Sequence, residues 1–251
     1  MLEIALFISI FFLVLVFFYK QKAEGFNILQ IESDKLSTFH ELLTEKYPIV
    51  IRGLGEPKFL TPEILKSTPR LHGFQLAPKL YIGDVLKDPK RLPSHLHIAE
   101  DVRRNLASEV GLHVWAEHSW LPHYTGENPS WFLTLDTKVS VGSIGMTKSN
   151  AYSTVIYPTS GKFICSLMLD SAEKFLPKHW QGKFLDELTV SDTPLLKEIQ
   201  FVDVVLRPGH MLHIPAHWIY CCKADAGASL PLCGVLEIHH PISKLASSLE
   251  N

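Results

Sequence analysis

Histidines gather in the last third of the chain, where they could build a metal site. His210, His213 and His217 lie close together, and His239 follows on a later apolar run. Imidazole is a common ligand of zinc and iron, so these residues form one candidate metal site. A spacing of three, however, puts His210 and His213 on opposite faces of an extended strand. Because no cysteine or carboxylate completes an obvious set, histidines with structural roles are the competing interpretation.

The segment that carries these histidines has the pattern of two short strands. Residues 204–206 and 211–214 are apolar runs that flank a Pro-Gly turn, and an Ile-Pro pair then leads to Trp218. Alternation along the second run puts Leu212 and His213 on opposite faces of the strand. This pattern is typical of an antiparallel sandwich, and we expect Trp218 to be a core residue.

The order Pro-Gly, Ile-Pro, two residues, Trp and one further residue resembles the second signature of the Jumonji-type, cupin-like iron and 2-oxoglutarate oxygenases. The run Pro-Ile-Val-Ile-Arg-Gly at 48–53 also resembles a strand that opens many of these domains. The resemblance covers roughly residues 27–241. It implies a double-stranded β-helix, the jelly-roll or cupin-like barrel, with iron(II) held by two histidines and one carboxylate.

The metal-binding positions of that pattern are replaced in this chain. Tyr220 stands where the family has its last histidine, and counting back from Gly161 puts Lys148 and Asn150 at the other two positions. No His, Asp or Glu occurs at residues 139–152 that a shifted alignment could use. An ammonium group repels a divalent ion, and neutral amide and phenol groups are poor substitutes for carboxylate and imidazole.

The co-substrate position is altered as well. The lysine that binds 2-oxoglutarate in the family lies two residues after the glycine, where this chain has Phe163. Lys162 comes one residue early, so its side chain is expected on the other face of the strand.

These replacements predict a non-catalytic binding module or structural and assembly module that holds no cofactor. Its degenerate pocket positions are Lys148, Asn150, Lys162 and Tyr220. The alternative is an iron(II) and 2-oxoglutarate-dependent hydroxylase or demethylase that recruits other ligands, drawn from the histidines named above. A zinc-dependent enzyme built on histidines 210, 213 and 217 is a third hypothesis.

Around this region the chain reads as many short strands. Strands are expected at 26–31, 48–54, 131–135, 138–144, 153–157, 162–169, 201–206, 211–214, 218–223 and 232–239. Helices are expected after Ser33, from Thr61, and at 99–110, whereas 113–130 has no clear period and is expected to be a loop. The predicted fold class is therefore mainly β with peripheral helices, arranged as a jelly-roll barrel at residues 23–251.

The N-terminus has a different composition. Residues 2–19 are apolar except for Glu3 and Ser9, which is close to the roughly 20 residues that cross a bilayer. This run predicts an uncleaved, single-pass transmembrane anchor at 1–22, with the lipid bilayer as its partner. Lys20 and Lys22 follow the run, so the positive-inside tendency predicts a cytosolic body.

Composition adds general limits. The chain has 251 residues, 46% of them hydrophobic and 20% charged, which suits one full-sized domain. A net charge of −2 gives no bulk attraction to nucleic acid, and we expect a protein partner instead. The four cysteines have no framework spacing, and the adjacent Cys221 and Cys222 are expected to be inert core thiols.

Overall fold

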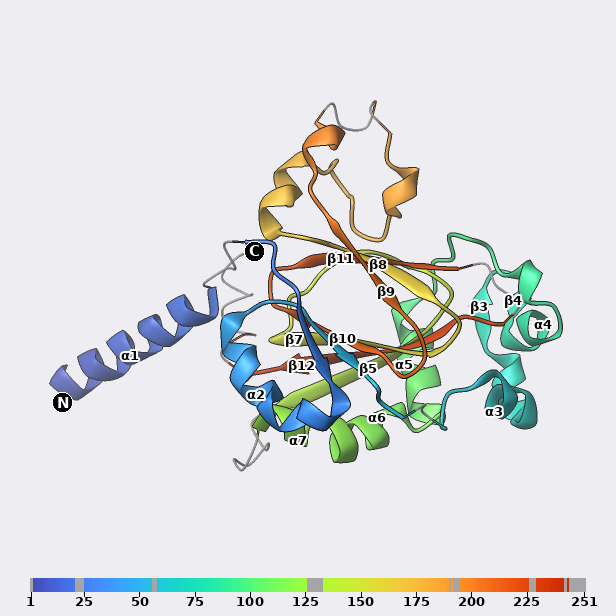
Figure 1. The fold of residues 1–251 in the computed structure, drawn as a ribbon, viewed down its shortest axis with the longest axis horizontal. Coiled ribbons are helices and arrows are strands. Elements are labelled where there is room, and N and C mark those ends of the chain that lie inside the picture. The colour runs from blue at the N-terminus through green and yellow to red at the C-terminus, as the bar shows by residue number, and fades with distance from the viewer. Residues whose placement is uncertain are drawn as a thin grey trace.

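Two β-sheets face one another at the centre of the protein, and short helices surround them (Figure 1). The computed structural model describes residues 2–20, 25–55, 58–125, 133–189, 191, 195–225, 229–241 and 243. The larger sheet has the order β1-β2-β10-β7-β12-β5, and the smaller one has the order β6-β11-β8-β9. A separate two-stranded sheet pairs β3 with β4.

Most strands lie close to where the apolar runs predicted them, but β3, β4 and β6 were not predicted. The strands expected at 131–135 and 138–144 form one strand, β5, and residues 131–132 lie outside the described structure. Those of the larger sheet are β1 (Leu29–Glu32), β2 (Ile49–Arg52), β5 (Thr134–Val141), β7 (Ser153–Ser160), β10 (Met211–Pro215) and β12 (Leu232–His239). Those of the smaller sheet are β6 (Ile144–Lys148), β8 (Phe163–Met168), β9 (Val202–Leu206) and β11 (Ile219–Ala224), and the small hairpin is β3 (Gln75–Ala77) and β4 (Leu80–Tyr81). The β1–β2 pair is parallel, whereas the other pairings are antiparallel.

The helices are short apart from the first and α5. They are α1 (Leu2–Lys20), η1 (Ser33–Thr38), α2 (Phe39–Leu42), η2 (Leu43–Glu45), α3 (Pro62–Ser67), η3 (Pro69–Gly73), α4 (Ile82–Lys87), η4 (Pro89–Arg91), α5 (Glu100–Glu109), α6 (Leu112–Trp115), η5 (Ala116–Trp120), α7 (Pro122–Thr125), η6 (Asp170–Phe175), η7 (Leu185–Glu187) and η8 (Leu196–Glu198). Two predicted boundaries are confirmed: Thr61 Oγ1 accepts the Ile64 N–H at the start of α3, and Gly111 follows α5 with a φ of 74°. Residues 112–125 form three short helical segments, so the loop expected there is wrong.

Hydrophobic side chains form three layers, one between the sheets and one on each outer face. Strand β10 shows the alternation that its sequence predicts: Leu212 packs between the sheets and Met211 packs under the helices. Trp218 also packs between the sheets and is 2% exposed, so its prediction as a core residue is confirmed. Helices α2, α5, α6 and α7 cover the outer face of the larger sheet, and residues 170–189 and 195–199 cover the smaller one.

The two sheets do not close into a barrel, so the predicted barrel fold class is wrong. Strand pairing in the described chain does not join the two sheets, which makes the fold a mixture of separate sheets and helices. The reason lies at the outer edge of β6. Met146 there exchanges backbone hydrogen bonds with Gly182 and Lys183, at 2.9 and 2.7 Å, so this edge cannot pair with β5. A side chain at Gly145 would collide with the Gly182 carbonyl, which explains the glycine.

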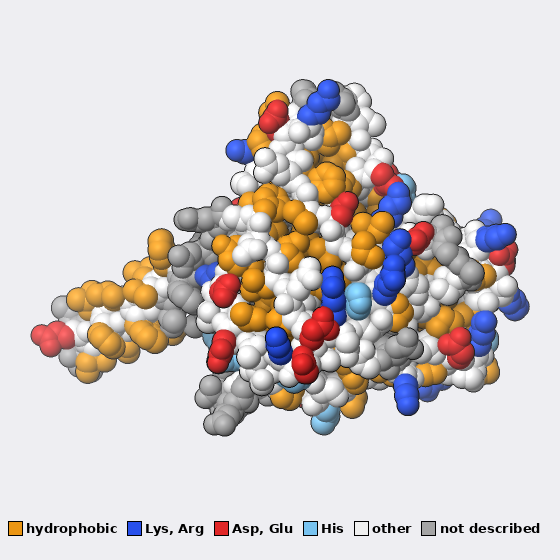
Figure 2. All heavy atoms as spheres, in the orientation of Figure 1, with side chains coloured by type: hydrophobic (Ala, Val, Ile, Leu, Met, Phe, Trp, Pro, Cys, Tyr) orange, Lys and Arg blue, Asp and Glu red, His pale blue; other side chains and the backbone are white. Residues whose placement is uncertain are grey.

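The first helix projects away from the body (Figure 1), and hydrophobic side chains cover its surface (Figure 2). Within the described residues, no helix combines the length and apolar character required to cross a membrane, so the predicted transmembrane helix is not supported. The described side chains of α1 lie between residues 3 and 17. Lys22 and the side chain of Lys20 lie outside the described residues.

Candidate functional site

Tyr220 lies between the two sheets. Its side chain is 2% exposed, and β11 pairs with its neighbours so that Thr147 of β6 and Leu167 of β8 lie opposite it. Burial raises the pKa of the phenol far above its usual range, and the nearby Glu237 carboxylate adds to the rise, whereas a hydrogen bond with Thr147 opposes it. Tyr220 is therefore a neutral phenol throughout the pH range of most proteins.

Lys148 lies on the strand next to Tyr220 but faces the opposite way. It pairs with Ile219, whose side chain packs in the outer layer. The Lys148 Nζ atom lies 2.6 Å from Asp170 Oδ1 and 2.7 Å from Glu173 Oε2. Burial lowers the pKa of this ammonium, but the hydrogen bonds to the two carboxylates outweigh burial and the pKa is raised. Lys148 thus stays charged and ties β6 to η6.

The other two degenerate positions lie away from Tyr220. Asn150 is exposed beyond the end of β6. Lys162 lies in the turn between β7 and β8, and its Nζ atom is 3.3 Å from Asp225 Oδ2. Tyr220 pairs with Leu167, and five positions of extended strand separate Leu167 from Lys162, which is about 16 Å. Of the four predicted pocket residues, the structure brings only Tyr220 between the sheets.

This arrangement does not fit the iron centre that the resemblance implies. Such a centre takes two imidazoles and a carboxylate. The surroundings of Tyr220 instead supply a neutral phenol, the hydroxyl of Thr147 and the Glu237 carboxylate, which is paired with Lys138 at 2.8 Å. Across the described part of the chain, no three His, Cys, Asp or Glu side chains are grouped so that they could hold a metal ion.

The histidines of the candidate metal site lie in different places. His210 lies in the turn before β10, and its buried Nδ1 atom has no hydrogen-bond partner in the described structure. His217 lies in the β10–β11 turn with a φ of 70°. His239 ends β12, where its Nε2 atom is 3.9 Å from Glu237 Oε2. His213 alone belongs to a compact polar cluster.

That cluster joins His213 to two hydroxyl groups on the helix side of the larger sheet. The Nδ1 atom of His213 lies 2.7 Å from Ser153 Oγ and 3.1 Å from the Tyr124 hydroxyl, and the two hydroxyls are 2.8 Å apart. Phe39 packs edge-on against the imidazole, with the ring centroids 5.6 Å apart. Burial lowers the pKa of His213 to about 3, so the ring is neutral at ordinary pH.

The cluster can satisfy its own hydrogen bonds. Tyr124 can donate to Ser153, and Ser153 can donate to the unprotonated Nδ1 atom of His213. A serine beside a histidine is also an arrangement found in nucleophilic catalysis. Ser153, however, is 0% exposed, so a substrate cannot reach its hydroxyl in this structure. The geometry supports a structural role.

Sequence reasoning missed the two hydroxyl residues for separate reasons. Ser153 begins a predicted strand and lies opposite Pro215 of β10. The two strands were foreseeable, but their register was not. Tyr124 lies in the segment expected to be a loop, where its position in α7 gave no periodic signal.

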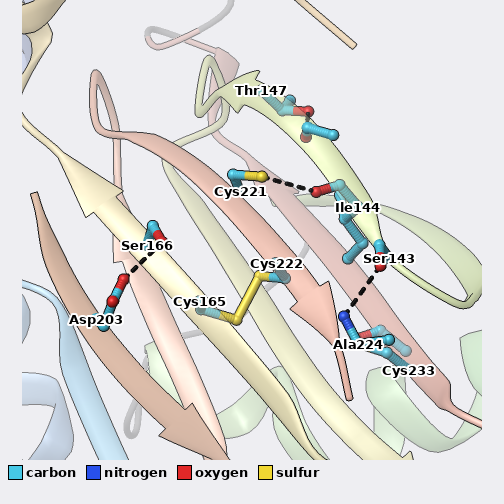
Figure 3. Close-up of a disulfide and its surroundings, with 12 residues drawn as sticks. Ser143, Ile144, Thr147, Cys165, Ser166, Asp203, Cys221, Cys222, Ala224 and Cys233 are labelled. Carbon is cyan, nitrogen blue, oxygen red and sulfur yellow. Dashed lines mark hydrogen bonds between the residues drawn. A yellow bond between two sulfur atoms is a disulfide. The ribbon is translucent and has the colours of Figure 1, made fainter. Parts of the chain in front are cut away.

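A disulfide joins Cys165 of β8 to Cys222 of β11, between the sheets (Figure 3). The two residues lie directly opposite in the strand register. Cys221 points to the outer layer and donates its S–H to the Ile144 carbonyl, and burial raises its pKa to about 11. Burial likewise raises the pKa of Cys233 to about 12. Cys221 and Cys233 are therefore protonated core thiols, as expected for Cys221, whereas Cys222 is a cross-link that the sequence spacing did not reveal.

Comparison with known proteins adds no family. A scan of protein-family models finds no match to this chain, and a search of curated proteins finds none either. The Jumonji-type resemblance therefore rests on the motif residues alone.

Proposed function

We propose that this protein is a non-catalytic binding module built on a jelly-roll-like pair of sheets. The observation that carries the proposal is the neutral, buried phenol of Tyr220 at the position where the resemblance requires a histidine. Lys148 supports it, because its side chain turns outward to two carboxylates. Neither residue can take the role of a metal ligand in this arrangement.

The packing around Tyr220 gives further support. Phe163, Trp218 and the Cys165–Cys222 disulfide belong to the same layer between the sheets. Side chains of this size stabilise a fold by excluding water, so the interior favours packing over substrate entry.

A cavity of about 530 Å³ on the outer face of the larger sheet supports binding as the role of the module. Trp115 and Tyr157 stack in its wall with ring centroids 5.2 Å apart, and Phe59 packs against Trp115. Lys58 is exposed at the same cavity, and the described residues that line it include no carboxylate. Aromatic walls beside an exposed cation suit a protein partner that inserts an apolar side chain next to an acidic one.

Metal analysis tests the non-catalytic part of the proposal. The full chain is produced with added iron, purified and assayed for bound iron and for succinate release from 2-oxoglutarate. We expect iron well below one equivalent and no succinate above the protein-free background. Tyr220→Phe should leave both results unchanged. Stoichiometric iron, or succinate release that depends on iron, would contradict the proposal.

Peptide selection tests the binding part. A displayed peptide library is selected against the full chain, and we expect enrichment of peptides with an aromatic or large aliphatic residue beside an acidic one. Trp115→Ala should abolish binding of the enriched peptides, whereas Tyr81→Ala, at an exposed aromatic residue on β4, should not. Melting curves confirm that both variants are folded. Peptides that bind Trp115→Ala as tightly as the parent would rule this cavity out.

A further inference from the structure

A second cavity, of about 600 Å³, opens at the end of the sandwich where β8 begins, opposite the end that carries Leu167. Five segments line it: the residues after α4, the β5–β6 turn, the β7–β8 turn, the end of β11 and the residues before β12. A volume of this size is typical of a site for a small molecule. It is separate from the aromatic cavity and from the surroundings of Tyr220, because the lining residues do not overlap.

Three lysines from three of these segments surround the cavity. The Nζ atom of Lys162 lies 3.3 Å from Asp225 Oδ2. The Nζ atom of Lys223 lies 2.6 Å from Oδ2 of Asp186, a residue outside the cavity lining. Lys90 makes no ion pair with any residue that the structure describes. Asp225 is the one carboxylate among the described lining residues, and Asp186 pairs with Lys223 from outside, so the three lysines exceed these two carboxylates by one positive charge.

The remaining lining residues divide into hydroxyls and an apolar floor. Ser143 Oγ accepts the Ala224 N–H at 3.0 Å, which leaves its own proton free to donate to a ligand. Leu92, Ile164 and Pro231 supply the apolar surface. The cavity therefore combines cations, a hydroxyl donor and a hydrophobic floor in one volume that is open to solvent.

We propose that this cavity, named here the lysine cavity, binds a small phosphorylated molecule. Lysine is a common phosphate ligand that acts as a point charge, and three ammonium groups on different segments can surround a compact dianion. The Ser143 hydroxyl can donate to the phosphate or to a ligand hydroxyl, and the floor accommodates an aliphatic or sugar body. The inference rests on the proposed binding role but is independent of whether the protein holds iron.

Substitution of Asp225 tests the proposal, because the proposal predicts an increase in the affinity for phosphate rather than a loss. Its carboxylate competes with a phosphate for Lys162 and also repels the anion across the cavity. Asp225→Asn should therefore tighten phosphate binding severalfold, whereas a purely structural role for the Lys162–Asp225 pair predicts no gain. Lys90→Gln and Lys162→Gln should each weaken binding about tenfold, because each removes one charge-assisted contact.

The experiment is a calorimetric titration of the full chain with glucose 6-phosphate, inorganic phosphate and glucose. We expect one site for the two phosphate probes, no binding of glucose, and weaker binding at higher salt. Lys35→Gln is the matched control, because Lys35 is an exposed lysine on η1, remote from the cavity lining. Melting curves confirm that each variant is folded.

Two results would overturn the inference. One is the absence of phosphate binding at millimolar concentration, and the other is an equal loss of binding in Lys35→Gln and Lys90→Gln. Iron-dependent succinate release together with intact phosphate binding would remove the proposed non-catalytic function and leave the lysine cavity standing. Failure of the lysine cavity alone would leave the iron and peptide results unaffected.

Discussion

The Ser153 hydroxyl oxygen lies 2.7 Å from the Nδ1 atom of His213, and both side chains are buried under the helices of the larger sheet. Phe39 and Tyr124 close the space around them. An imidazole in this position cannot take up a proton without losing its hydrogen bond from serine and placing a charge in the core. The cluster therefore couples the stability of the fold to pH.

Acid should destabilise the protein through His213. Its folded-state pKa of about 3 lies below the ordinary 6.5, so the stabilisation is complete above about pH 6.5 and is lost as the pH falls towards 3. In that window the unfolded chain binds a proton that the folded chain excludes. One such group lowers the free energy of unfolding by at most about 1.4 kcal/mol per pH unit. Denaturant unfolding at several pH values across this window measures the slope of the free energy of unfolding against pH.

Variants separate His213 from other histidines. Burial also lowers the pKa of His123 and His240, so these residues add to the slope of the parent protein. The contribution of His213 is therefore the difference in slope between the parent and a His213 variant. His213→Phe should reduce the slope, whereas His40→Gln, at an exposed position, should keep the parental slope. An unchanged slope in His213→Phe would show that another group governs the acid response.

The Cys165–Cys222 disulfide should contribute strongly to stability. It links residues 57 positions apart, and a loop of this length corresponds to about 4 kcal/mol in the chain-entropy description. Reductant should lower the free energy of unfolding of the parent and leave the double variant Cys165→Ala/Cys222→Ala unaffected. Cys221→Ala is the control and should keep the response to reductant. A parent protein that ignores reductant after full reduction of its thiols would contradict this role.

Trp218→Ala should destabilise the protein by about 3–5 kcal/mol, the usual loss for truncating a large buried ring. Trp218 is 2% exposed and its ring packs edge-on against Phe26, with centroids 5.9 Å apart. Thermal melting measures the loss. Trp218→Phe keeps much of the volume and should lose less. If the alanine variant melted within a few degrees of the parent, Trp218 would not support the layer between the sheets.

Lys148→Gln should destabilise the link between β6 and η6. The Lys148 side chain is 16% exposed and its ammonium group contacts two carboxylates, so its loss removes the cation that lies between Asp170 and Glu173. We expect a loss of about 2 kcal/mol, intermediate between exposed and buried ion pairs. A double-mutant cycle with Glu173→Gln measures the coupling. Zero coupling would mean that Lys148 and Glu173 act independently.

The sequence predicts most strands of the two sheets, but not β6 and not the direction in which each side chain points. The pairing of β6 with β11 shifts between Tyr220 and Cys222, because Ile144 pairs with Cys222 and Thr147 with Tyr220. This bulge reverses the alternation along β6, so Thr147 faces inward and Lys148 outward. Counting residues from Gly161 cannot detect a bulge, because a bulge depends on the partner strand.

Tertiary packing also decides the segment from 112 to 125. Its helical pieces are four or five residues long, too short for a hydrophobic period to emerge. Trp120 and Tyr124 are nevertheless buried there, because both rings pack against Phe39 of α2. Contacts between segments so distant in sequence leave no local signal. For the same reason the cross-link to Cys222 and the lysine cavity could not be foreseen.

The backbone contact between Met146 and residues 182–183 has a consequence for solubility. An uncovered strand edge offers free N–H and C=O groups to the strands of other molecules, and this is a common route to aggregation. Here the chain's own backbone occupies the edge of β6. Gly145 allows that close approach, so a substituent at this single position would expose the edge and recruit neighbouring molecules into intermolecular sheets.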